Sequence, residues 1–409
     1  MLILSEGDVK AVLTMDTCVE AIEAAYRLYE MGEAVQVPRN ELEIFSEGDY
    51  SKEIPSLQEG TAKDYPMFRH AAQGLPGPYF FSLKTMSGAV PKGGPFPFGC
   101  GALRLNVDIL SNTRTIDGTL RRQQIPAAPG GRFCGQVHLW RTENAEPICM
   151  MPDSYIEAMR VGATNAIAAR YLAREDASTY GLIGSGLQAE TQLLGISHVR
   201  SLKRVKVWSP TKDHREAFAK KWSQTLSLDV TAVSEFAEAL EGSDMVGAAT
   251  NSMEPVFRDR SLIRQGAFIT VANTFNMSRE FFEACDIRVV HNNRMAWPMD
   301  RTKLVFTPRE ARRFISYWVT ESVAEKDPLL KLFQDSWLNK IETERIAWLG
   351  DVILGRVRRT SPSQTAAFIN NVGIGLQFAA VGVKVFEKAV AAGVGRELPT
   401  EWFTEEIQG

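Results

Sequence analysis

A glycine-rich motif near the middle of the chain has the residue types and spacing to bind a dinucleotide. Residues 184–189 read Gly-Ser-Gly-Leu-Gln-Ala, follow the apolar run 180–183 and precede a segment with helical spacing. The first glycine of such a motif permits a tight turn, the second lets a pyrophosphate approach the backbone, and the small last residue allows close packing of helix and strand. An ordinary glycine turn is the alternative. The predicted phosphate-binding residues are Gly184, Ser185, Gly186, Leu187 and Gln188.

The end of the next predicted strand bears on which dinucleotide is bound. This strand ends at Trp208, and Ser-Pro-Thr-Lys follows at residues 209–212, about where an acidic residue would hold the ribose 2'-hydroxyl of NAD. Hydroxyls and a lysine can instead accept a 2'-phosphate, although Asp213 is near enough to leave the choice between NADP and NAD open. The sequence favours NADP, with contacts from Ser209, Thr211 and Lys212.

A polar turn after a later strand is a further candidate for the cofactor site. Residues 249–252 follow the fourth predicted strand, at the carboxyl edge of the sheet where ligands bind in such folds. Thr250 and Asn251 are expected to contact the nicotinamide or its ribose; the alternative is a plain turn.

The elements that position these residues follow two different patterns. From Thr179 onward predicted strands and helices alternate, which implies a doubly wound parallel sheet of the Rossmann type. Between Val37 and Pro152 short alternating runs separated by Pro and Gly predict a mixed sheet. The helices expected around them span residues 16–31, 153–174 and 363–390, the second opened by Ser154 and Glu157 in the spacing of a capping box.

These patterns predict an α/β protein in which a Rossmann domain is inserted into a mixed α+β domain. At 409 residues the chain exceeds the size at which one core usually keeps growing. We expect residues 156–345 to form the Rossmann domain and residues 1–155 and 346–409 to form the other.

Composition excludes several function classes. A net charge of -3 gives no basic field for nucleic acid, and an apolar stretch near residues 373–385 is interrupted by Gln377 and Lys384, so it is not a membrane span. Five scattered cysteines without a Cys-x-x-Cys pair favour a reducing compartment, and the N-terminus lacks a signal-peptide core, so a cytoplasmic protein is expected. The five histidines have no metal-ligand spacing, so no metal is expected.

Over nearly its whole length the sequence resembles the ornithine cyclodeaminase and mu-crystallin family. The resemblance rests on an ordered series of features and not on any single one. These are Pro38-Arg39 after the opening helix, Lys84 at the end of an apolar strand, Arg160-Val161-Gly162-Ala163, LIGSGLQA, AATNSMEPVF, GAFITVANTFNMSREF and the late NNVGIGLQFAAVG.

The resemblance implies a homodimer whose first domain supplies the dimer interface and much of the substrate pocket, and hydride transfer at a carbon that bears nitrogen. By position, Arg39, Lys84 and Arg160 look like the family's basic residues that hold the substrate carboxylate, with Lys84 also placed to assist proton transfer. An arginine fork binds a carboxylate bidentately, and a desolvated lysine can lose its proton. A surface charge is the alternative for each.

One departure from the family decides between reactions. Thr274 stands where ornithine cyclodeaminases carry a catalytic aspartate, six residues before Glu280. A threonine at this substrate-binding position cannot act as a carboxylate base near neutral pH. The prediction is therefore an NAD(P)-dependent imine (ketimine) reductase or amino-acid dehydrogenase. The alternatives are an ammonia-lyase of the ornithine cyclodeaminase type and a non-catalytic, NADP-dependent small-molecule binding protein.

Two further departures affect the pocket. Phe378 stands where many relatives have an aspartate, and the segment between Lys84 and Gly135 is longer than usual.

Overall fold

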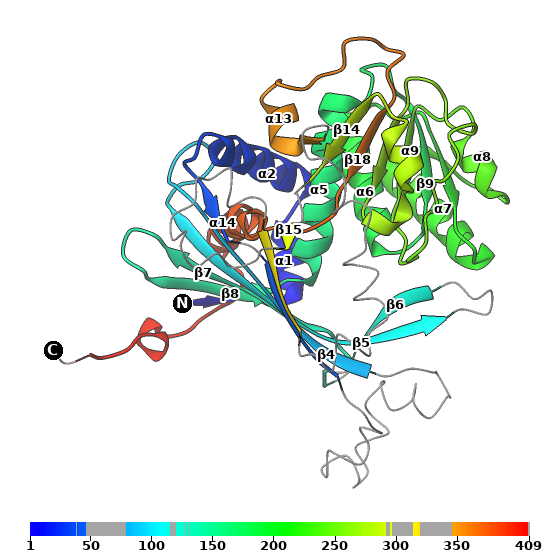
Figure 1. Ribbon diagram of the computed structural model, residues 1–409. Helices are drawn as coiled ribbons and strands as arrows, with labels where there is room; N and C mark the ends of the chain where they lie inside the picture. Colours follow the sequence, from blue (N-terminus) through cyan, green and yellow to red (C-terminus); the bar gives the residue numbers. More distant parts are fainter. Residues whose placement is uncertain are drawn as a thin grey trace, which may run out of the picture.

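The computed structural model describes residues 1–37, 39–45, 79–114, 120–126, 128–129, 131–291, 295–296, 314–319 and 346–407. Within these residues the strands form two sheets, one mixed and one entirely parallel (Figure 1). The predicted fold class, a doubly wound parallel sheet together with a mixed α+β unit, is confirmed.

The parallel sheet has the strand order β11-β10-β9-β12-β13-β18-β14-β17, and every neighbouring pair is parallel. The chain runs from β9 to one edge and then returns to the other side of β9. The carboxyl ends of β9 and β12 therefore flank a topological switch point, where open sheets of this type bind ligands. The strands are β9 (Thr179–Ile183), β10 (Arg204–Trp208), β11 (Asp229–Ala232), β12 (Met245–Ala248), β13 (Phe268–Val271), β14 (Ile287–Val290), β17 (Ala347–Trp348) and β18 (Ala366–Ile369). The helices are α6 (Leu187–Val199), α7 (Lys212–Leu226), α8 (Phe236–Leu240), α9 (Arg279–Glu283) and α13 (Leu349–Ile353), with the 3-10 turn η3 (Thr274–Asn276).

Two strands of this sheet, β17 and β18, come from the segment after residue 345. The expected domain division placed this segment in the other domain, whereas β18 hydrogen-bonds between β13 and β14. The sequence predicts a helix that begins at residue 363, but the run from Ala366 to Ile369 forms β18. A short, fully buried apolar run has no periodicity that separates a strand from a helix, which explains the difference.

The mixed sheet has the order β15-β16-β3-β4-β5-β7-β8-β1-β19, with β2 paired to β4 and β6 paired to β5. Its strands are β1 (Leu2–Ile3), β2 (Val35–Gln36), β3 (Arg39–Phe45), β4 (Tyr79–Val90), β5 (Cys100–Arg114), β6 (Leu120–Ile125), β7 (Cys134–Arg141), β8 (Pro147–Pro152), β15 (Met295–Ala296), β16 (Phe314–Val319) and β19 (Arg396–Glu397). Its helices are α1 (Glu6–Val12), α2 (Met15–Glu30) and α14 (Gly375–Ala392), with η6 (Thr400–Phe403) near the C-terminus. Of these helices, α14 contacts β4, β5 and β7.

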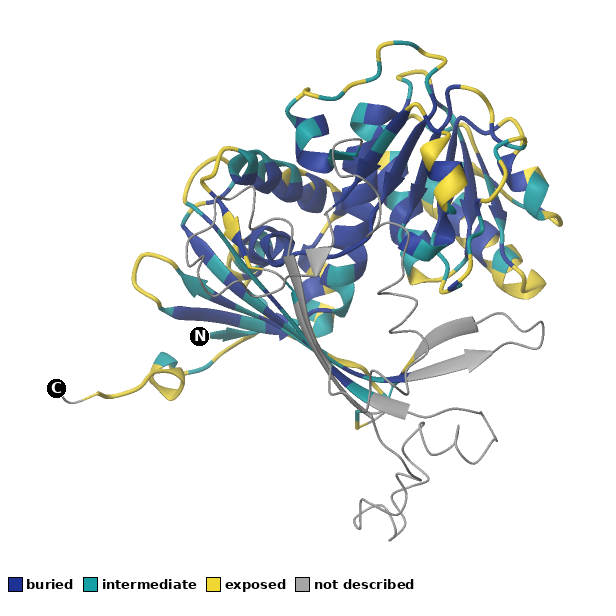
Figure 2. Cartoon of the chain, in the orientation of Figure 1, coloured by how far each residue is buried: buried dark blue, intermediate teal, exposed yellow. Residues whose placement is uncertain are grey.

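Helix α5 (Ser154–Leu172) joins the two sheets, contacting α2 on one side and α6 on the other, and is almost entirely buried (Figure 2). Its backbone touches that of α6 at two glycines. A Cβ on Gly162 would lie 2.3 Å from the Thr191 carbonyl oxygen, and one on Gly195 would lie 2.6 Å from the Gly162 carbonyl oxygen. The start of α6, which carries the glycine motif, is therefore fixed relative to α5. No helix in the described ranges is both long enough and apolar enough to cross a bilayer.

Polar and apolar side chains alternate along strand β5, and the polar ones are unusually the ones that face inward. Arg104, Asn106 and Asp108 are buried on the face toward the helices and the parallel sheet. The opposite face of the sheet carries half-buried apolar side chains, which are absent from the described hydrophobic cores. They are Phe81 and Leu83 of β4, Leu103, Leu105, Val107 and Ile109 of β5, and Trp140 of β7, and we call this set the outer face.

Candidate functional site

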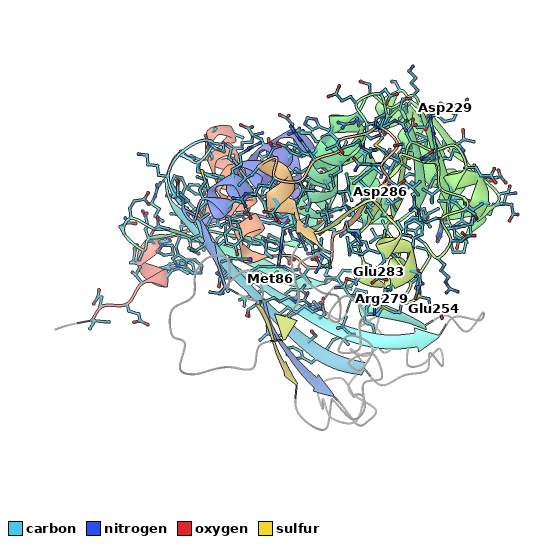
Figure 3. All side chains as sticks on the ribbon, turned by 45° about the horizontal axis from the view of Figure 1, so that its top comes forward. Met86, Asp229, Glu254, Arg279, Glu283 and Asp286 are labelled. Carbon is cyan, nitrogen blue, oxygen red and sulfur yellow. The ribbon has the colours of Figure 1, made fainter. Side chains whose placement is uncertain are left out.

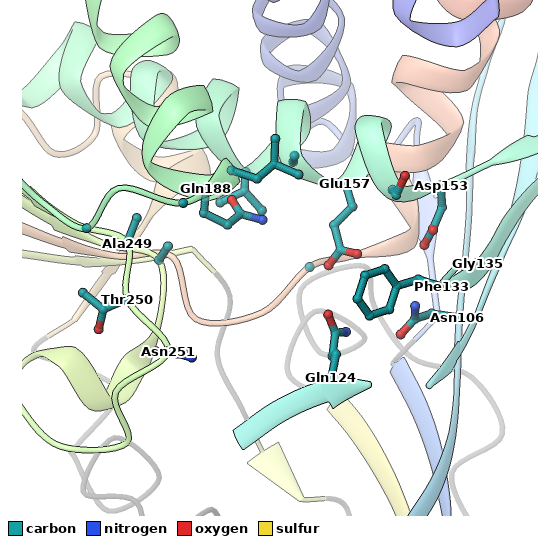
Figure 4. Close-up of a pocket in the computed structure, with 18 of the residues that line it drawn as sticks. Asn106, Gln124, Phe133, Gly135, Asp153, Glu157, Gln188, Ala249, Thr250 and Asn251 are labelled. Carbon is teal, nitrogen blue, oxygen red and sulfur yellow. The ribbon is translucent and has the colours of Figure 1, made fainter. Parts of the chain in front are cut away.

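A cleft of about 1700 Å³ extends from the carboxyl edge of the parallel sheet to the mixed sheet (Figure 4). Both the predicted cofactor-binding residues and the predicted substrate-binding residues contribute to this cleft. The predicted residues that line it are Arg39, Arg160, Gly184, Ser185, Gly186, Leu187, Gln188, Ser209, Thr211, Thr250 and Asn251. The structure does not bring Lys84, Lys212 or Thr274 into that lining.

The glycine loop after β9 has the geometry that a dinucleotide phosphate requires. Gly184 has φ +119, and a Cβ there would lie 2.4 Å from the Ala249 carbonyl oxygen, so only glycine fits. Gly186 is the N-cap of α6 and provides no side-chain cap, while a Cβ there would meet no atom of the described residues within 4 Å. Open space thus lies beside backbone N–H groups at a helix N-terminus, where anions bind.

A buried acceptor lies next to this loop. The Gln188 Oε1 atom is buried and has no hydrogen-bond partner among the described residues. A buried polar atom without a partner is costly unless a ligand or water satisfies it. Together with the open space at Gly186, this atom indicates that the loop fits a dinucleotide.

The loop after β10 carries hydroxyl groups and no acid in the cleft lining. Ser185 Oγ donates to Ser209 Oγ at 3.0 Å, and the Arg215 Nη1 atom donates to the Ser209 carbonyl oxygen at 2.9 Å. His214 also lines this end of the cleft. Lys212 is 71% exposed and lies 3.8 Å from Glu216, on the first turn of α7 outside the cleft. Sequence reasoning missed Arg215 and His214, which follow on the same helix.

The turn after β12 is held by two asparagines that the sequence did not single out. Thr250 Oγ1 donates to Asn276 Oδ1 at 3.4 Å, and the Asn276 Nδ2 atom donates to the Ser252 carbonyl oxygen at 3.0 Å. The Asn273 Nδ2 atom donates to the same carbonyl at 3.2 Å. These bonds fix Thr250 and Asn251 at the cleft edge.

Arg160 of α5 is 4% exposed at the other end of the cleft. Its Nη1 atom donates to Gln377 Oε1 at 3.2 Å, and its Nη2 atom donates to Glu157 Oε1 at 3.3 Å. A Cβ on Gly373 would lie 2.6 Å from Nη1 and Nη2, so this glycine leaves room for the guanidinium. Burial lowers the pKa of Arg160 to about 10, which keeps it charged at neutral pH.

A second arginine, which the sequence analysis missed, lies behind this group. Arg104 of β5 is 1% exposed, with Nε at 2.5 Å from Asp153 Oδ2 and Nη2 at 2.5 Å from Glu157 Oε2. Its Nη1 atom is 3.9 Å from the sulfur of Met86, which Figure 3 labels. The Phe378 ring lies under both guanidinium groups, 5.0 Å from Arg104 Cζ and 5.4 Å from Arg160 Cζ. Phe378 thus forms a cation–π platform under the two arginines.

The capping box predicted at the start of α5 is wrong. The N-cap is Asp153, without a side-chain cap, and Ser154 Oγ donates to Glu6 Oε2 at 2.7 Å. Glu157 binds Arg104 and Arg160 instead. Charge-assisted bonds to buried guanidinium groups are stronger than a bond to a backbone N–H, which accounts for the difference.

Lys84 and Thr274 lie beside the cleft lining and not in it. The Lys84 Nζ atom is 3.2 Å from Asp108 Oδ2, its side chain is 13% exposed, and Asp108 itself lines the cleft. Thr274 begins η3 and is 2% exposed, with no described hydrogen-bond partner for Oγ1. No set of three or more His, Cys, Asp or Glu side chains in the described ranges is grouped to hold a metal ion.

Comparison with known proteins adds independent information. The family model described as the ornithine cyclodeaminase/mu-crystallin family matches residues 132–289. A Δ1-pyrroline-2-carboxylate reductase of Bacillus cereus (strain ATCC 10987 / NRS 248) is 23% identical over 264 residues, 64% of this chain and 74% of the relative. An alanine dehydrogenase of Archaeoglobus fulgidus is 24% identical over 402 residues, 97% of this chain and 98% of the relative. Among solved structures, Thermococcus litoralis Δ1-pyrroline-2-carboxylate reductase in complex with NADH and L-proline is similar with a TM-score of 0.64 at 20% identity, covering 97% of this chain and 100% of that one.

Proposed function

From the premise that this chain belongs to the ornithine cyclodeaminase/mu-crystallin family, we propose that it is an NAD(P)-dependent oxidoreductase of an imino or amino acid. The reaction is the reduction of a C=N centre, or its reverse. One observation carries this proposal: a single cleft joins the glycine loop, at Gly186, to the buried guanidinium of Arg160. The Thermococcus litoralis reductase, which has a similar fold and was solved in complex with NADH and L-proline, supports this proposal.

Arg160 and Arg39 would bind the substrate carboxylate. Both line the cleft, and Arg160 uses only one N–H on each of Nη1 and Nη2 within the described residues. A planar guanidinium carries five N–H donors in a fork that fits a carboxylate. Its position over Phe378 and beside Gly373 fixes the orientation of that fork.

Lys84 would act as the acid and base. In the direction of reduction its ammonium gives a proton to the substrate nitrogen, and in the direction of oxidation its amine takes one back. Asp108 holds the Lys84 Nζ atom at 3.2 Å and so restricts where the proton is delivered. A nicotinamide held at the glycine loop would supply the hydride-transfer chemistry. Thr274 offers no carboxylate for a second proton abstraction, which disfavours cyclodeamination.

The function is tested by following reduced nicotinamide absorbance with purified protein, NADPH or NADH, and a panel of cyclic imino acids and of 2-oxo acids with amines. We expect oxidation of the nicotinamide with at least one of these substrates. No oxidation with any of them, despite measurable dinucleotide binding, would contradict the proposal. Release of ammonia from diamino acids without net cofactor change would then indicate a lyase, and its absence a binding protein.

We propose NADP as the preferred coenzyme, because Ser209, Thr211 and His214 line the cleft end after β10 and no acidic side chain of the described residues does. Ser209→Asp is expected to lower the NADPH-to-NADH ratio of kcat/KM roughly 100-fold, since apposed like charges cost several kcal/mol. Ser209→Asn is the matched control, because asparagine is nearly the same size as aspartate but uncharged. It should leave the NADPH-to-NADH ratio within about threefold of the wild-type ratio. A wild-type enzyme that uses NADH as well as NADPH would argue against this choice.

We also propose that the two domains follow the two sheets, so that β17 and β18 belong to the Rossmann domain.

We further propose that the chain forms a homodimer through the outer face. Side chains of the outer face are adjacent across strands; Leu83, for example, is in register with Val107. Contiguous apolar surface on a folded chain marks an interaction site.

The dimer is tested by molar mass from light scattering. The wild type should show twice the chain mass, and Leu105→Glu should shift it to the monomer, weakening association roughly 100-fold or more, because an unpaired charge in an interface costs several kcal/mol. Val390→Glu is the control, since Val390 is a 57% exposed apolar residue of α14 away from the outer face. A monomeric wild type would refute the dimer.

A further inference from the structure

Glu157 and Arg160 place opposite charges side by side in the cleft. They are three residues apart on α5, and Glu157 Oε1 lies 3.3 Å from the Arg160 Nη2 atom. Both line the cleft, but Glu157 is the more accessible, with 33% of its side chain exposed against 5% for Arg160. Figure 4 shows the Glu157 carboxylate directed into the cleft, between Gln188 on one side and Phe133 and Asn106 on the other.

The carboxylate of Glu157 is held rigidly and stays ionised. Its second oxygen, Oε2, is 2.5 Å from the Nη2 atom of the buried Arg104. Burial raises the pKa of Glu157, but the charges of Arg104 and Arg160 outweigh this effect and hold the pKa below its ordinary value. A fixed negative charge therefore faces the cleft beside the arginine assigned to the substrate carboxylate.

This pair is complementary to one class of small molecule. In a 2-amino or 2-imino acid the carboxylate and the nitrogen are attached to the same carbon, so the two charges of its zwitterion are as close together as those of Arg160 and Glu157. We infer that Glu157 is a substrate-binding residue that receives the cationic nitrogen of a 2-amino or 2-imino acid whose carboxylate binds Arg160. The inference rests on the proposed function and names the group that recognises the reacting nitrogen.

The proposed role of Glu157 in binding the substrate nitrogen depends on its negative charge. It is distinct from the role of Glu157 as an ion-pair partner of Arg104. Asp153 already binds Arg104, at 2.5 Å from Nε, and its side chain is only 3% exposed. Both carboxylates line the cleft, but the Glu157 side chain is 33% exposed and is therefore far more accessible to a ligand. A negative charge next to a protonated imine favours the iminium form, the better hydride acceptor, so Glu157 also promotes the reaction.

The test is calorimetric binding to the full chain saturated with oxidised dinucleotide, using matched ligand pairs that differ only in nitrogen: L-proline with cyclopentanecarboxylate, and L-alanine with propionate. The wild type should bind the amino acid of at least one pair roughly 10-fold or more tightly than its nitrogen-free partner, as expected for a charge-assisted hydrogen bond of about 1.5–3 kcal/mol. Glu157→Gln should bring the two affinities within about twofold by weakening only the amino acid.

Asp153→Asn is the matched control, because it removes the other carboxylate of Arg104 and should keep the preference for the amino acid. Glu157→Asp should restore part of it. Thermal unfolding and dinucleotide affinity of each variant check that the cleft is intact.

Each result has a defined meaning. A Glu157→Gln variant that keeps the preference would overturn the inference, as would equal weakening of both members of a pair, since Glu157 would then only position Arg160. If the wild type oxidises reduced nicotinamide with an imine but prefers the nitrogen-free acids, the inference fails while the proposed function stands. If it neither turns over imines nor binds either member of any pair, the proposed function fails and the inference with it.

Discussion

Lys84→Met is expected to lower kcat for imine reduction roughly 1000-fold while leaving dinucleotide affinity within about twofold, since a positioned general acid contributes about 10²–10⁴. The Lys84 side chain is 13% exposed, and its Nζ atom lies 3.2 Å from Asp108 Oδ2 at the cleft. Steady-state kinetics at saturating substrate and cofactor measures this effect. Lys203→Met, which changes an exposed lysine before β10, is the control and should leave kcat unchanged.

The loss could also come from the charge that Lys84→Met leaves behind. Asp108 has a side chain only 1% exposed, and an uncompensated buried carboxylate is strongly destabilising. The double variant Lys84→Met with Asp108→Asn removes both charges. If the double variant is as slow as the single one, the missing proton donor is responsible; recovery of kcat would assign Lys84 a purely electrostatic role.

Gly186→Ala is expected to weaken dinucleotide binding roughly 10- to 100-fold without unfolding the chain. Its Cβ would meet no atom of the described part of the chain within 4 Å, so the fold accepts it, but it would fill the space beside the first turn of α6. Forcing a methyl group into a tight contact costs about 1–3 kcal/mol, which gives this range. Fluorescence titration with NADPH measures the affinity.

The control for this variant is Gly101→Ala. Among the residues that the structure describes, a Cβ on Gly101 of β5 also meets nothing within 4 Å, and Gly101 does not line the cleft. Its dinucleotide affinity should match that of the wild type. Equal affinity of all three proteins would show that the phosphates do not approach Gly186.

The glycine motif could be predicted from the sequence because its determinants are local. The turn at Gly184, the N-cap at Gly186 and the strand before them lie within a few residues of one another, so spacing alone describes the site. The alternation of strands and helices gave the parallel sheet for the same reason. The family resemblance added Arg39 and Arg160, which the fold brings to one cleft.

The contacts behind the cleft could not be predicted, because they depend on strand register. Arg104 meets Asp153 and Glu157 across 49 and 53 residues, and Lys84 meets Asp108 across 24. A signal was present in β5, where Arg104, Asn106 and Asp108 alternate with leucine and valine. Alternation shows that two faces differ, but it does not show that the polar face is the one turned inward.

The contact of α5 with α6 at Gly162 and Gly195 fixes the position of one helix relative to the other. Because the two backbones touch there, the helix that carries Arg160 and the helix that begins at the glycine loop cannot slide apart without opening the core. In the proposed reaction, the distance between the arginine that binds the substrate carboxylate and the loop that binds the dinucleotide is therefore set by the packing of these two helices.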